Sequence, residues 1–495
     1  MTKRKGTVTA EIGIQEFTGM PISYVNAVRT PWPRTTAYPM SSFRKFKPEP
    51  ENTFPSFDPN KLPQLWPGKQ TWDNWRVHNE YNQVADVMGF KVLIALVRGE
   101  NADFSDGERI AFFYSKDGEH YKAGGYLFGD SKLYPDVREW SGSTVFRDNG
   151  TLQTFYTVAH GVQYNGVFQT AQRLATAIQQ VRVSDDGEDL IVEAPHVHTL
   201  LRGCEEPDGQ LYETPEQASI REGEHPTRHS RRVGSDQTEN NCDRDPYWFK
   251  DQRTGKEYLF FEGNTGAAFH PAGCIRQEYL GTIPVDGFAP TEDMLKANGC
   301  VGCIELTNEL GTYGLRKTPW LVTNLMTDEI ERITVVEHQD HFYLFVVCHG
   351  NKHALNAENP DLVNRDFMLG FRAKTLGGEL TPLNGTGVVI QQKSLGDAYA
   401  GQMANQQYVY SWQVNCDIME DENRFNVVTY ANYCSAADGS GIQQYMNAGP
   451  SVVLEIDGLN TRIVDLMYDI QADYDSAQVD EEATKKHVVS ESQQY

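Results

Sequence analysis

Short segments rich in aromatic and β-branched residues recur along the chain, each ahead of a glycine. Segments of this kind, separated by polar breaks, are typical of the strands of a repeated sheet. They lie at 110–114, 154–158, 258–262, 342–347 and 426–430, and an apolar run at 92–97 opens the regular part of the chain. We expect them to be equivalent inner strands of repeated antiparallel sheets that are separated by long insertions.

Helical periodicity is scarce, and the best short candidates are residues 215–221 and 291–297. Repeated sheets with few helices favour an all-β fold of the β-propeller type. A β-sandwich with long loops is the alternative, because the spacing between the repeated segments is irregular.

The two ends of the chain differ from its middle. Residues 1–60 are rich in proline, serine, threonine and aromatic residues and show no clear period, which predicts an N-terminal arm packed on the sheets. Residues 61–468 would form the repeated sheet domain. Residues 469–495 are acidic and are predicted to be a solvated C-terminal tail.

Acidic residues outnumber basic ones by 68 to 44, which gives a formal net charge of -24. This balance argues against nucleic acid and anionic membranes as partners and favours a neutral partner. No apolar run of about 18 residues occurs, so no membrane span is predicted. The basic residues Lys3 to Lys5 are not followed by an apolar stretch, so no signal peptide is predicted; prior processing, unconventional export and an intracellular location stay open.

The stretch from Thr327 to Arg332 places four charged residues ahead of a β-branched run. In an extended strand the side chains alternate, so Glu329 and Glu331 would share one face and Asp328 would lie on the other. Two carboxylates about 7 Å apart oppose each other's ionisation, so one can keep its proton and act as a general acid. The alternative is an exposed strand edge that carries charge.

Two further acidic motifs stand far apart in the sequence. Asp73 lies between Trp72 and Trp75, and aromatic walls around a carboxylate suit a sugar face. Asp245 follows Arg244, whose charge can keep a carboxylate ionised. For the Asp73 motif, the alternative is a surface turn with one buried tryptophan. For the Asp245 motif, the alternative is a salt-bridged turn. One protonated and one ionised carboxyl group are what retaining glycoside hydrolysis requires.

Four motifs in this order resemble glycoside hydrolase family 68, the bacterial levansucrases, inulosucrases and related β-fructofuranosidases. They are Trp72-Asp73, Glu139-Trp140-Ser141-Gly142-Ser143, Arg244-Asp245-Pro246 and Asp328-Glu329-Ile330-Glu331-Arg332. The resemblance spans residues 72–410 and implies a five-bladed β-propeller with the active site in its central funnel. It also implies cleavage of the β-fructofuranosyl bond of sucrose, with fructosyl transfer to water or to sugar acceptors.

By the same resemblance, Asp73 would be the nucleophile, Asp245 the transition-state stabiliser and Glu331 the acid/base. The residues implied to bind the sugars are Trp72, Trp140, Ser141, Arg244, Glu329, His349 and Tyr410. His349 stands where many members carry an arginine, which leaves acceptor preference open because histidine has fewer donors. A non-catalytic sucrose- or fructan-binding propeller and a propeller hydrolase of another furanoside are the alternative functions.

The resemblance implies no required cofactor, but some members bind a structural calcium ion through the aspartate that corresponds to Asp328. Pairing of Asp328 with Arg332 is the alternative. Cys300 and Cys303 have the spacing of half a zinc site, but no second pair and no close histidine accompany them, so two core cysteines are predicted. The family also implies a secreted protein, whereas oligomeric state and the linkage of any product stay open.

Overall fold

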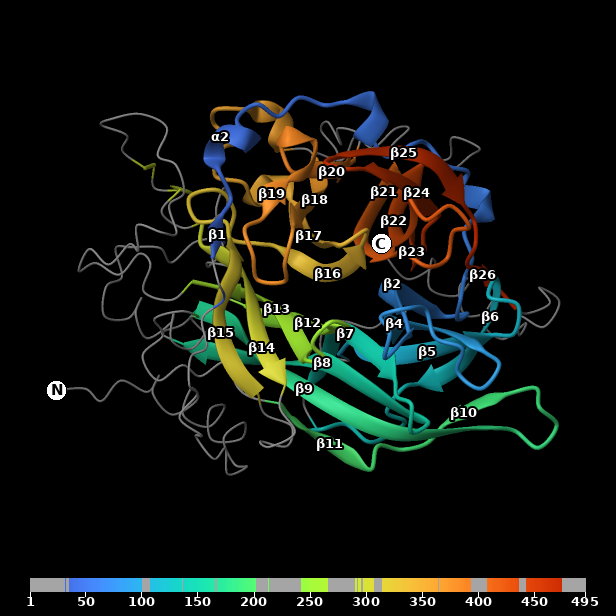
Figure 1. Ribbon diagram of the computed structural model, residues 1–495. Helices are drawn as coiled ribbons and strands as arrows, with labels where there is room; N and C mark the ends of the chain where they lie inside the picture. The colour runs from blue at the N-terminus through green and yellow to red at the C-terminus, as the bar shows by residue number, and fades with distance from the viewer. Residues whose placement is uncertain are drawn as a thin grey trace, which may run out of the picture.

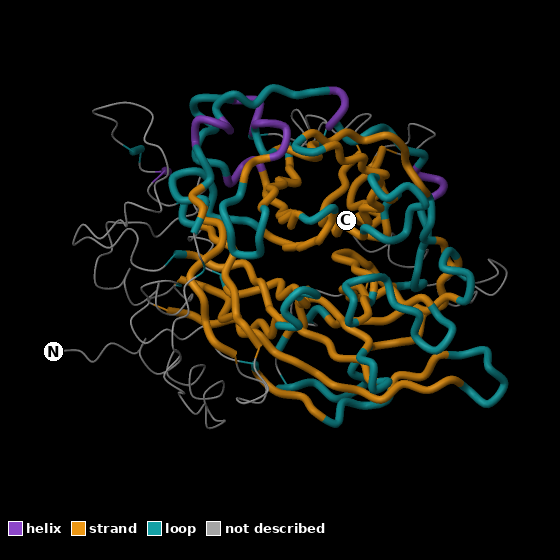
Figure 2. Tube along the Cα trace, viewed as in Figure 1, coloured by secondary structure: helices purple, strands orange, loops and turns teal. Residues whose placement is uncertain are grey.

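The computed structural model describes residues 32, 35–99, 107–135, 137–164, 167–201, 212, 242–265, 290–291, 293–294, 297–306, 314–363, 365–392, 407–435 and 442–473. Nearly all regular structure in these ranges is strand (Figure 2). The described helices are short, and none is long and apolar enough to cross a membrane. The predicted helix at 215–221 lies outside the described residues, and so do residues 292, 295 and 296 of the one at 291–297, in which residues 293–294 are helical.

The strands form five antiparallel sheets, which we call blades 1 to 5 in chain order. Blade 1 contains β2 (Lys69–Arg76), β4 (Lys91–Gly99), β5 (Arg109–Ser115) and β6 (His120–Tyr126). Blade 2 contains β7 (Arg138–Phe146), β8 (Thr151–Tyr164), β9 (Val167–Val183), β10 (Leu190–Val192) and β11 (Val197–Leu200), and β3 (His78–Asn79) pairs with β7. Blade 3 contains β12 (Asp243–Lys250), β13 (Glu257–Asn264), β14 (Gly299–Leu306) and β15 (Gly314–Val322).

Blades 4 and 5 complete the molecule. Blade 4 contains β16 (Glu331–His338), β17 (His341–His349), β18 (Asp366–Ala373), β19 (Thr381–Pro382) and β20 (Val388–Gln391). Blade 5 contains β21 (Gln407–Asn415), β22 (Arg424–Ser435), β23 (Ile442–Ala448), β24 (Ser451–Asp457) and β25 (Asn460–Met467).

The five blades close into a ring around a central axis (Figure 1). The first strands of the blades contact one another in the order β2, β7, β12, β16 and β21, and β21 contacts β2 again. The prediction of an all-β, five-bladed β-propeller is therefore confirmed, and the sandwich alternative is wrong. A closed ring directs the first strand of every blade towards one funnel, where residues far apart in sequence can meet.

The repeated apolar segments are not the innermost strands, and this corrects the sequence-based prediction. Segments 154–158, 258–262, 342–347 and 426–430 lie in β8, β13, β17 and β22, the second strands of their blades, as 92–97 does in β4. The segment 110–114 lies in β5, the third strand of blade 1. A second strand is paired on both edges and packed on both faces, so it is uniformly apolar, whereas the first strands carry polar residues that face the funnel.

The residues before the propeller cross the outer side of three blades (Figure 1). β1 (Thr36–Ala37) adds a parallel strand to β15 of blade 3. Phe43, in the helix α2 (Met40–Phe43), stacks on His353 of blade 4 with 4.1 Å between ring centroids. The amide of Asn52 donates to the Thr461 carbonyl of blade 5 at 2.9 Å. Residues 36–52 thus connect blades 3, 4 and 5 from outside.

The end of the propeller lies later in the chain than the predicted boundary at residue 469. Asp469 and Ile470 are buried, and β26 (Gln471–Ala472) pairs in parallel with β6 of blade 1. The Asp469 carboxylate accepts from Arg76 at 2.9 Å and from Asn426 of blade 5 at 2.9 Å. The first residues of the acidic stretch therefore connect blade 1 to blade 5. Residues 474–495 lie outside the described part of the chain.

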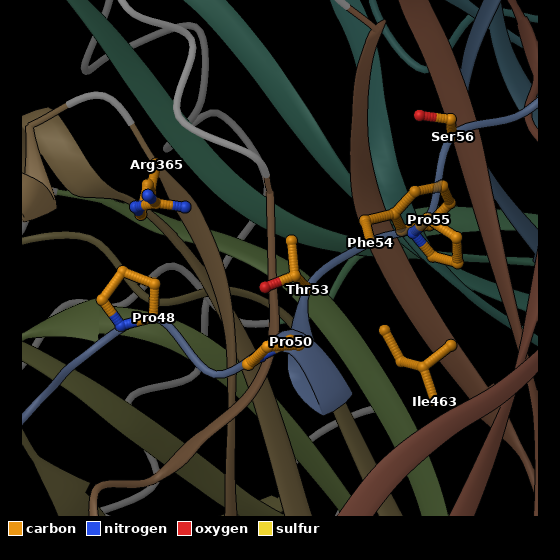
Figure 3. A pocket seen from close by; sticks show the side chains of 8 residues that line it. All are labelled: Pro48, Pro50, Thr53, Phe54, Pro55, Ser56, Arg365 and Ile463. Carbon is orange, nitrogen blue, oxygen red and sulfur yellow. The ribbon is translucent and has the colours of Figure 1, made fainter.

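A pocket of about 610 Å³ opens between the N-terminal segment and the outer parts of blades 4 and 5 (Figure 3). It is lined by Pro48, Pro50, Thr53, Phe54, Pro55, Ser56, Arg365 and Ile463. None of these residues is among those predicted to form the active site.

Candidate active site

Every first strand carries a bulge near the funnel. The pairing register shifts between Trp72 and Asn74, Trp140 and Gly142, Arg244 and Tyr247, Glu331 and Thr334, and Tyr410 and Gln413. A bulge inserts an unpaired residue and breaks the alternation of side chains. The dipeptides at these five bulges are Trp72-Asp73, Trp140-Ser141, Arg244-Asp245, Glu331-Arg332 and Tyr410-Ser411. Eight of these ten residues were predicted from the sequence, and Arg332 and Ser411 were not assigned to the site.

The stretch from Thr327 to Arg332 is not a regular strand, which corrects the alternation argument. β16 begins only at Glu331, and Arg332 has a left-handed backbone with φ of 51°. Asp245, at the matching bulge of blade 3, has φ of 55°. Glu329 and Glu331 nevertheless meet, because both approach the same guanidinium of Arg244, at 3.9 Å and 2.5 Å. Tertiary contacts, not strand geometry, bring the two carboxylates together.

Asp73 is held by a residue of the next blade. Ser141 Oγ donates to Asp73 Oδ2 at 2.5 Å. The two predicted tryptophans lie beside this pair in sequence and are partly buried. Trp140 Nε1 donates to Glu108 at 3.3 Å, and the guanidinium of Arg98 lies 5.5 Å from the Trp72 ring centroid. The carboxylate of Asp73 is thus fixed in position while its residue stays partly exposed.

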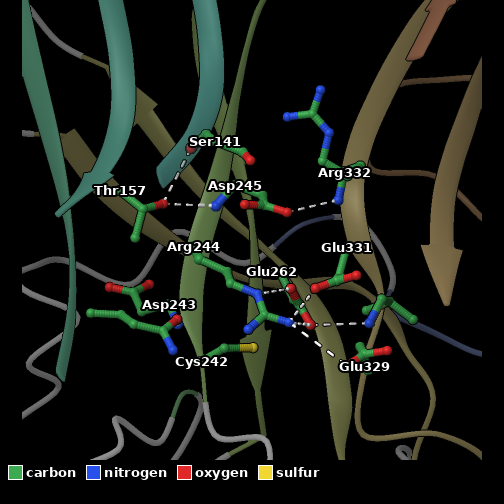
Figure 4. Close-up of polar contacts among 12 residues, drawn as sticks. Ser141, Thr157, Cys242, Asp243, Arg244, Asp245, Glu262, Glu329, Glu331 and Arg332 are labelled. Carbon is green, nitrogen blue, oxygen red and sulfur yellow. Dashed lines mark hydrogen bonds and ion pairs between the residues drawn. The ribbon is translucent and has the colours of Figure 1, made fainter. Parts of the chain in front are cut away.

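Asp245 is buried and bonded through both its backbone and its side chain (Figure 4). Its N–H donates to Thr157 Oγ1 at 3.0 Å, and its Oδ2 accepts from the backbone N–H of Arg332 at 3.1 Å. Burial raises the pKa of Asp245 to about 6; Arg244 and Arg332 oppose this, and the charges of Glu331 and Asp73 add to it. Thr157, which accepts from Asp245, also donates to the carbonyl of Ser141, and Ser141 holds Asp73. Because oxygens of Asp245 and Glu331 lie within 4.8 Å of one another, these contacts bring Asp73, Asp245 and Glu331, from three different blades, to one site.

Glu331 is bonded at both carboxylate oxygens. Arg244 Nη2 donates to its Oε1 at 2.5 Å, and the hydroxyl of Tyr410 donates to its Oε2 at 2.5 Å. These donors come from the first strands of blades 3 and 5, on either side of Glu331 in blade 4. Glu331 is therefore placed by its two neighbouring blades, and partial exposure leaves it able to meet a ligand.

Glu262 belongs to this group of charges and was not found from the sequence. It lies directly opposite Arg244 in the β12–β13 register and is fully buried. Arg244 Nε donates to Glu262 at 2.7 Å, and the oxygens of Asp245, Glu262 and Glu331 lie within 4.8 Å of one another (Figure 4). Burial first, and then the neighbouring carboxylates, raise the pKa of Glu262 to about 8, against the pull of Arg244. A lone glutamate at the end of an apolar strand was the only local signal.

His349 occupies the side of the site beyond Glu329. Its backbone N–H donates to Glu329 at 3.2 Å, and its ring stacks on Tyr410 with 4.1 Å between centroids. Its Nδ1 lies 2.9 Å from Asp366 Oδ2. Asp366, at the start of β18, is a second residue that was not predicted, because only the strand register places it opposite His349.

Asp328 precedes Glu329 in sequence and is fully buried. Its backbone carbonyl accepts from Asn264 at 3.2 Å. The predicted alternative partner, Arg332, donates instead to the Asn74 carbonyl at 2.9 Å. No cluster of acidic and histidine side chains among the described residues includes Asp328. Calcium binding at Asp328 stays a prediction.

The two cysteines with zinc-like spacing are core residues, as predicted. Cys300 and Cys303 are both buried in β14. The clusters of metal-competent side chains among the described residues contain neither of them.

The match to known proteins extends over the whole propeller. Residues 32–470 match the family described as Levansucrase/Invertase. Levansucrase from Bacillus amyloliquefaciens is 31% identical over 385 residues, which cover 72% of this chain and 75% of that protein. Inulosucrase from Halalkalicoccus jeotgali bound to kestose is similar in structure, with a TM-score of 0.68 and 25% identity over 89% of this chain and 98% of that one. Bacillus subtilis levansucrase shares the fold, with a TM-score of 0.68 and 24% identity over 88% of this chain and 98% of that one.

Proposed function

The chain belongs to the levansucrase/invertase family, and on this premise we propose that its funnel cleaves sucrose with retention and transfers the fructosyl group to water or to a sugar acceptor. The protein is an enzyme of the fructosyltransferase type within the glycoside hydrolases. The observation that carries the proposal is the convergence of Asp73, Asp245 and Glu331 from the first strands of three blades, which are joined through Ser141 and Thr157 and through the short distance between Asp245 and Glu331.

In the first step, a carboxylate oxygen of Asp73 attacks the anomeric carbon of the fructosyl unit, and Glu331 protonates the departing glucose oxygen. Ser141 supports this step because its hydrogen bond fixes the orientation of the attacking carboxylate. Asp245 faces the same sugar and accepts hydrogen bonds from its hydroxyl groups. In the second step, Glu331 takes a proton from water or from an acceptor hydroxyl, which attacks the fructosyl-enzyme.

The part of the site that would bind the departing glucose contains Arg244, Glu329 and His349. Arg244 offers donors there while it holds Glu331, and Glu329 offers an acceptor. His349 lies next to Glu329 and closes this side of the site. Water and a second sugar would compete for this region once glucose has left, so its residues influence the ratio of hydrolysis to transfer.

Glucose release from sucrose tests the proposal. Asp73→Asn and Glu331→Gln remove the reacting groups but keep the side-chain shapes, so we expect folded variants with activity reduced by about 100-fold to 10,000-fold or more. Circular dichroism and thermal unfolding establish that each variant is folded. Undiminished glucose release from either folded variant would refute the assigned roles.

Sucrose binding without turnover, and turnover of another furanoside, are the competing functions. Sucrose and arabinan assayed side by side separate them, because of the three functions only the proposed one releases glucose from sucrose. Product analysis in concentrated sucrose then distinguishes β-2,6 from β-2,1 products and polymers from short oligosaccharides.

Two further parts of the proposal concern location and calcium. We propose a secreted protein, which is tested by assaying the culture medium and the cells separately. Calcium bound at Asp328 would raise the unfolding temperature, and this is tested by adding and chelating calcium; no catalytic step depends on it.

A further inference from the structure

His349 and Asp366 face each other across two neighbouring strands of blade 4. His349 ends β17, Asp366 begins β18, and the antiparallel register pairs them directly. His349 Nδ1 lies 2.9 Å from Asp366 Oδ2. Asp366 is 3% exposed, and its other oxygen accepts from the Gly350 N–H at 3.1 Å. One oxygen of the carboxylate is therefore fixed by a backbone hydrogen bond, and the other forms an ion pair with the imidazole.

The other groups around His349 are mainly acidic. Glu329 Oε1 lies 3.9 Å from His349 Nε2, and an oxygen of Glu331 lies within 4.8 Å of both groups. Tyr410 stacks on the ring with an interplanar angle of 9°. Arg244 lies 3.9 Å from Glu329 and is paired with Glu262 and Glu331. Burial alone would lower the pKa of His349, but the charges of Asp366 and then Glu329 raise it to about 10.

We propose that Asp366 is a positioning residue that keeps His349 as an imidazolium ion, so that the leaving-group side of the pocket carries a fixed positive charge. An imidazolium donates from both nitrogens. Nδ1 is paired with Asp366 as an ion pair, which leaves Nε2–H to donate to a hydroxyl oxygen of the departing glucose or of an incoming sugar acceptor. The inference rests on the proposed function for the identity of the sugar, but the charge of His349 can be measured independently.

The test is the pH dependence of kcat/KM for sucrose cleavage and of the transfer-to-hydrolysis ratio in the Asp366→Asn variant. Asparagine keeps an acceptor for the Gly350 N–H but removes the charge, so His349 should lose its proton near its ordinary pKa of about 6.5. We expect wild-type-like behaviour at pH 5.5. Between pH 6 and pH 8, kcat/KM should fall by about 10-fold to 100-fold relative to the wild type, because a charged hydrogen bond is lost.

The double variant His349→Arg with Asp366→Asn is the matched control. Arginine stays charged at every working pH, so the additional pH dependence should disappear. A drop in activity that is the same at all pH values, or a pH dependence that persists in the double variant, would overturn the inference.

Histidine NMR separates this inference from the proposed function. In wild-type protein with labelled histidine, the His349 signal, identified by its loss in His349→Arg, should show no titration between pH 5 and 8.5. A titration in that range would refute the inference even if sucrose is cleaved. A constant signal in a protein that releases no glucose would instead refute the proposed function alone. This measurement needs no Asp366 variant, so it decides the matter if Asp366→Asn does not fold.

Discussion

Ser141 Oγ on blade 2 donates a hydrogen bond of 2.5 Å to Asp73 Oδ2 on blade 1. Each residue is the inserted one at the bulge of its strand. The bulges therefore place the two side chains on the same side of neighbouring blades, although 68 residues separate them in sequence. The orientation of the proposed nucleophile depends on a contact between blades.

Ser141→Ala removes this contact. Because a hydrogen bond to a charged group contributes about 1.5 to 3 kcal/mol, we expect kcat/KM for sucrose to fall by about 10-fold to 100-fold. Ser143→Ala is the control: Ser143 donates to the Pro246 carbonyl and accepts from the Trp248 N–H, so its loss should lower stability more than kcat/KM. Equal kinetic losses in both folded variants would contradict the role of Ser141.

Tyr410→Phe removes the donor to Glu331 Oε2 but keeps the ring that stacks on His349. We expect kcat to fall about 10-fold, since one of the two bonds that hold the acid/base is lost. The KM for sucrose should change little, because the stacked ring remains. Steady-state kinetics at the pH optimum checks this, and an unchanged kcat would mean that Arg244 alone positions Glu331.

Glu262 makes the stability of the protein dependent on pH. Its pKa is about 8 in the folded protein against an ordinary 4.5, so the folded state keeps a proton that the unfolded chain releases between these values. Stability from this group is complete below pH 4.5 and is lost as pH rises towards 8, by at most about 1.4 kcal/mol per pH unit.

Glu262→Gln should remove this contribution. The pKa values of Asp245 and His349 are also raised in the folded protein, so their contributions to stability fall with rising pH as well. The test therefore compares the variant with the wild type at each pH. We expect similar denaturant midpoints at pH 5 and a more stable variant at pH 8. Glu262→Ala, which also removes the acceptor for Arg244 and for the Ile330 N–H, should be less stable at both pH values. A variant-to-wild-type difference that does not change with pH would contradict the assignment.

Asp469 joins the end of the propeller to its first and fifth blades through Arg76 and Asn426. Asp469→Asn leaves the buried Arg76 guanidinium without its charged partner, which should lower the free energy of unfolding by about 3 kcal/mol. Asp473 is exposed, and Asp473→Asn should change stability by less than about 0.5 kcal/mol. Urea unfolding measures both, and a small effect at Asp469 would show that closure of the ring does not need this pair.

The sequence alone determined those properties of this protein that depend on residues adjacent in the chain. Apolar segments of strand type predicted the all-β propeller, and the short motifs at 72–73, 140–141, 244–245 and 329–331 contained most of the site. This works because each first strand brings two consecutive residues to the funnel at its bulge, so the chemistry stays contiguous in sequence. The apolar signal was strongest in the second strands, which is why they were mistaken for the innermost ones.

Only the tertiary structure revealed Glu262 and Asp366. Each lies on a strand next to the one that carries its partner, Arg244 or His349, and pairing across strands depends on the register of hydrogen bonds and not on distance along the chain. The same holds for the left-handed backbone at Asp245 and Arg332, which is set by bulges in the ring of first strands. The reacting groups can therefore be identified from short sequence motifs. Their charge and orientation depend on residues that come into contact only in the folded propeller.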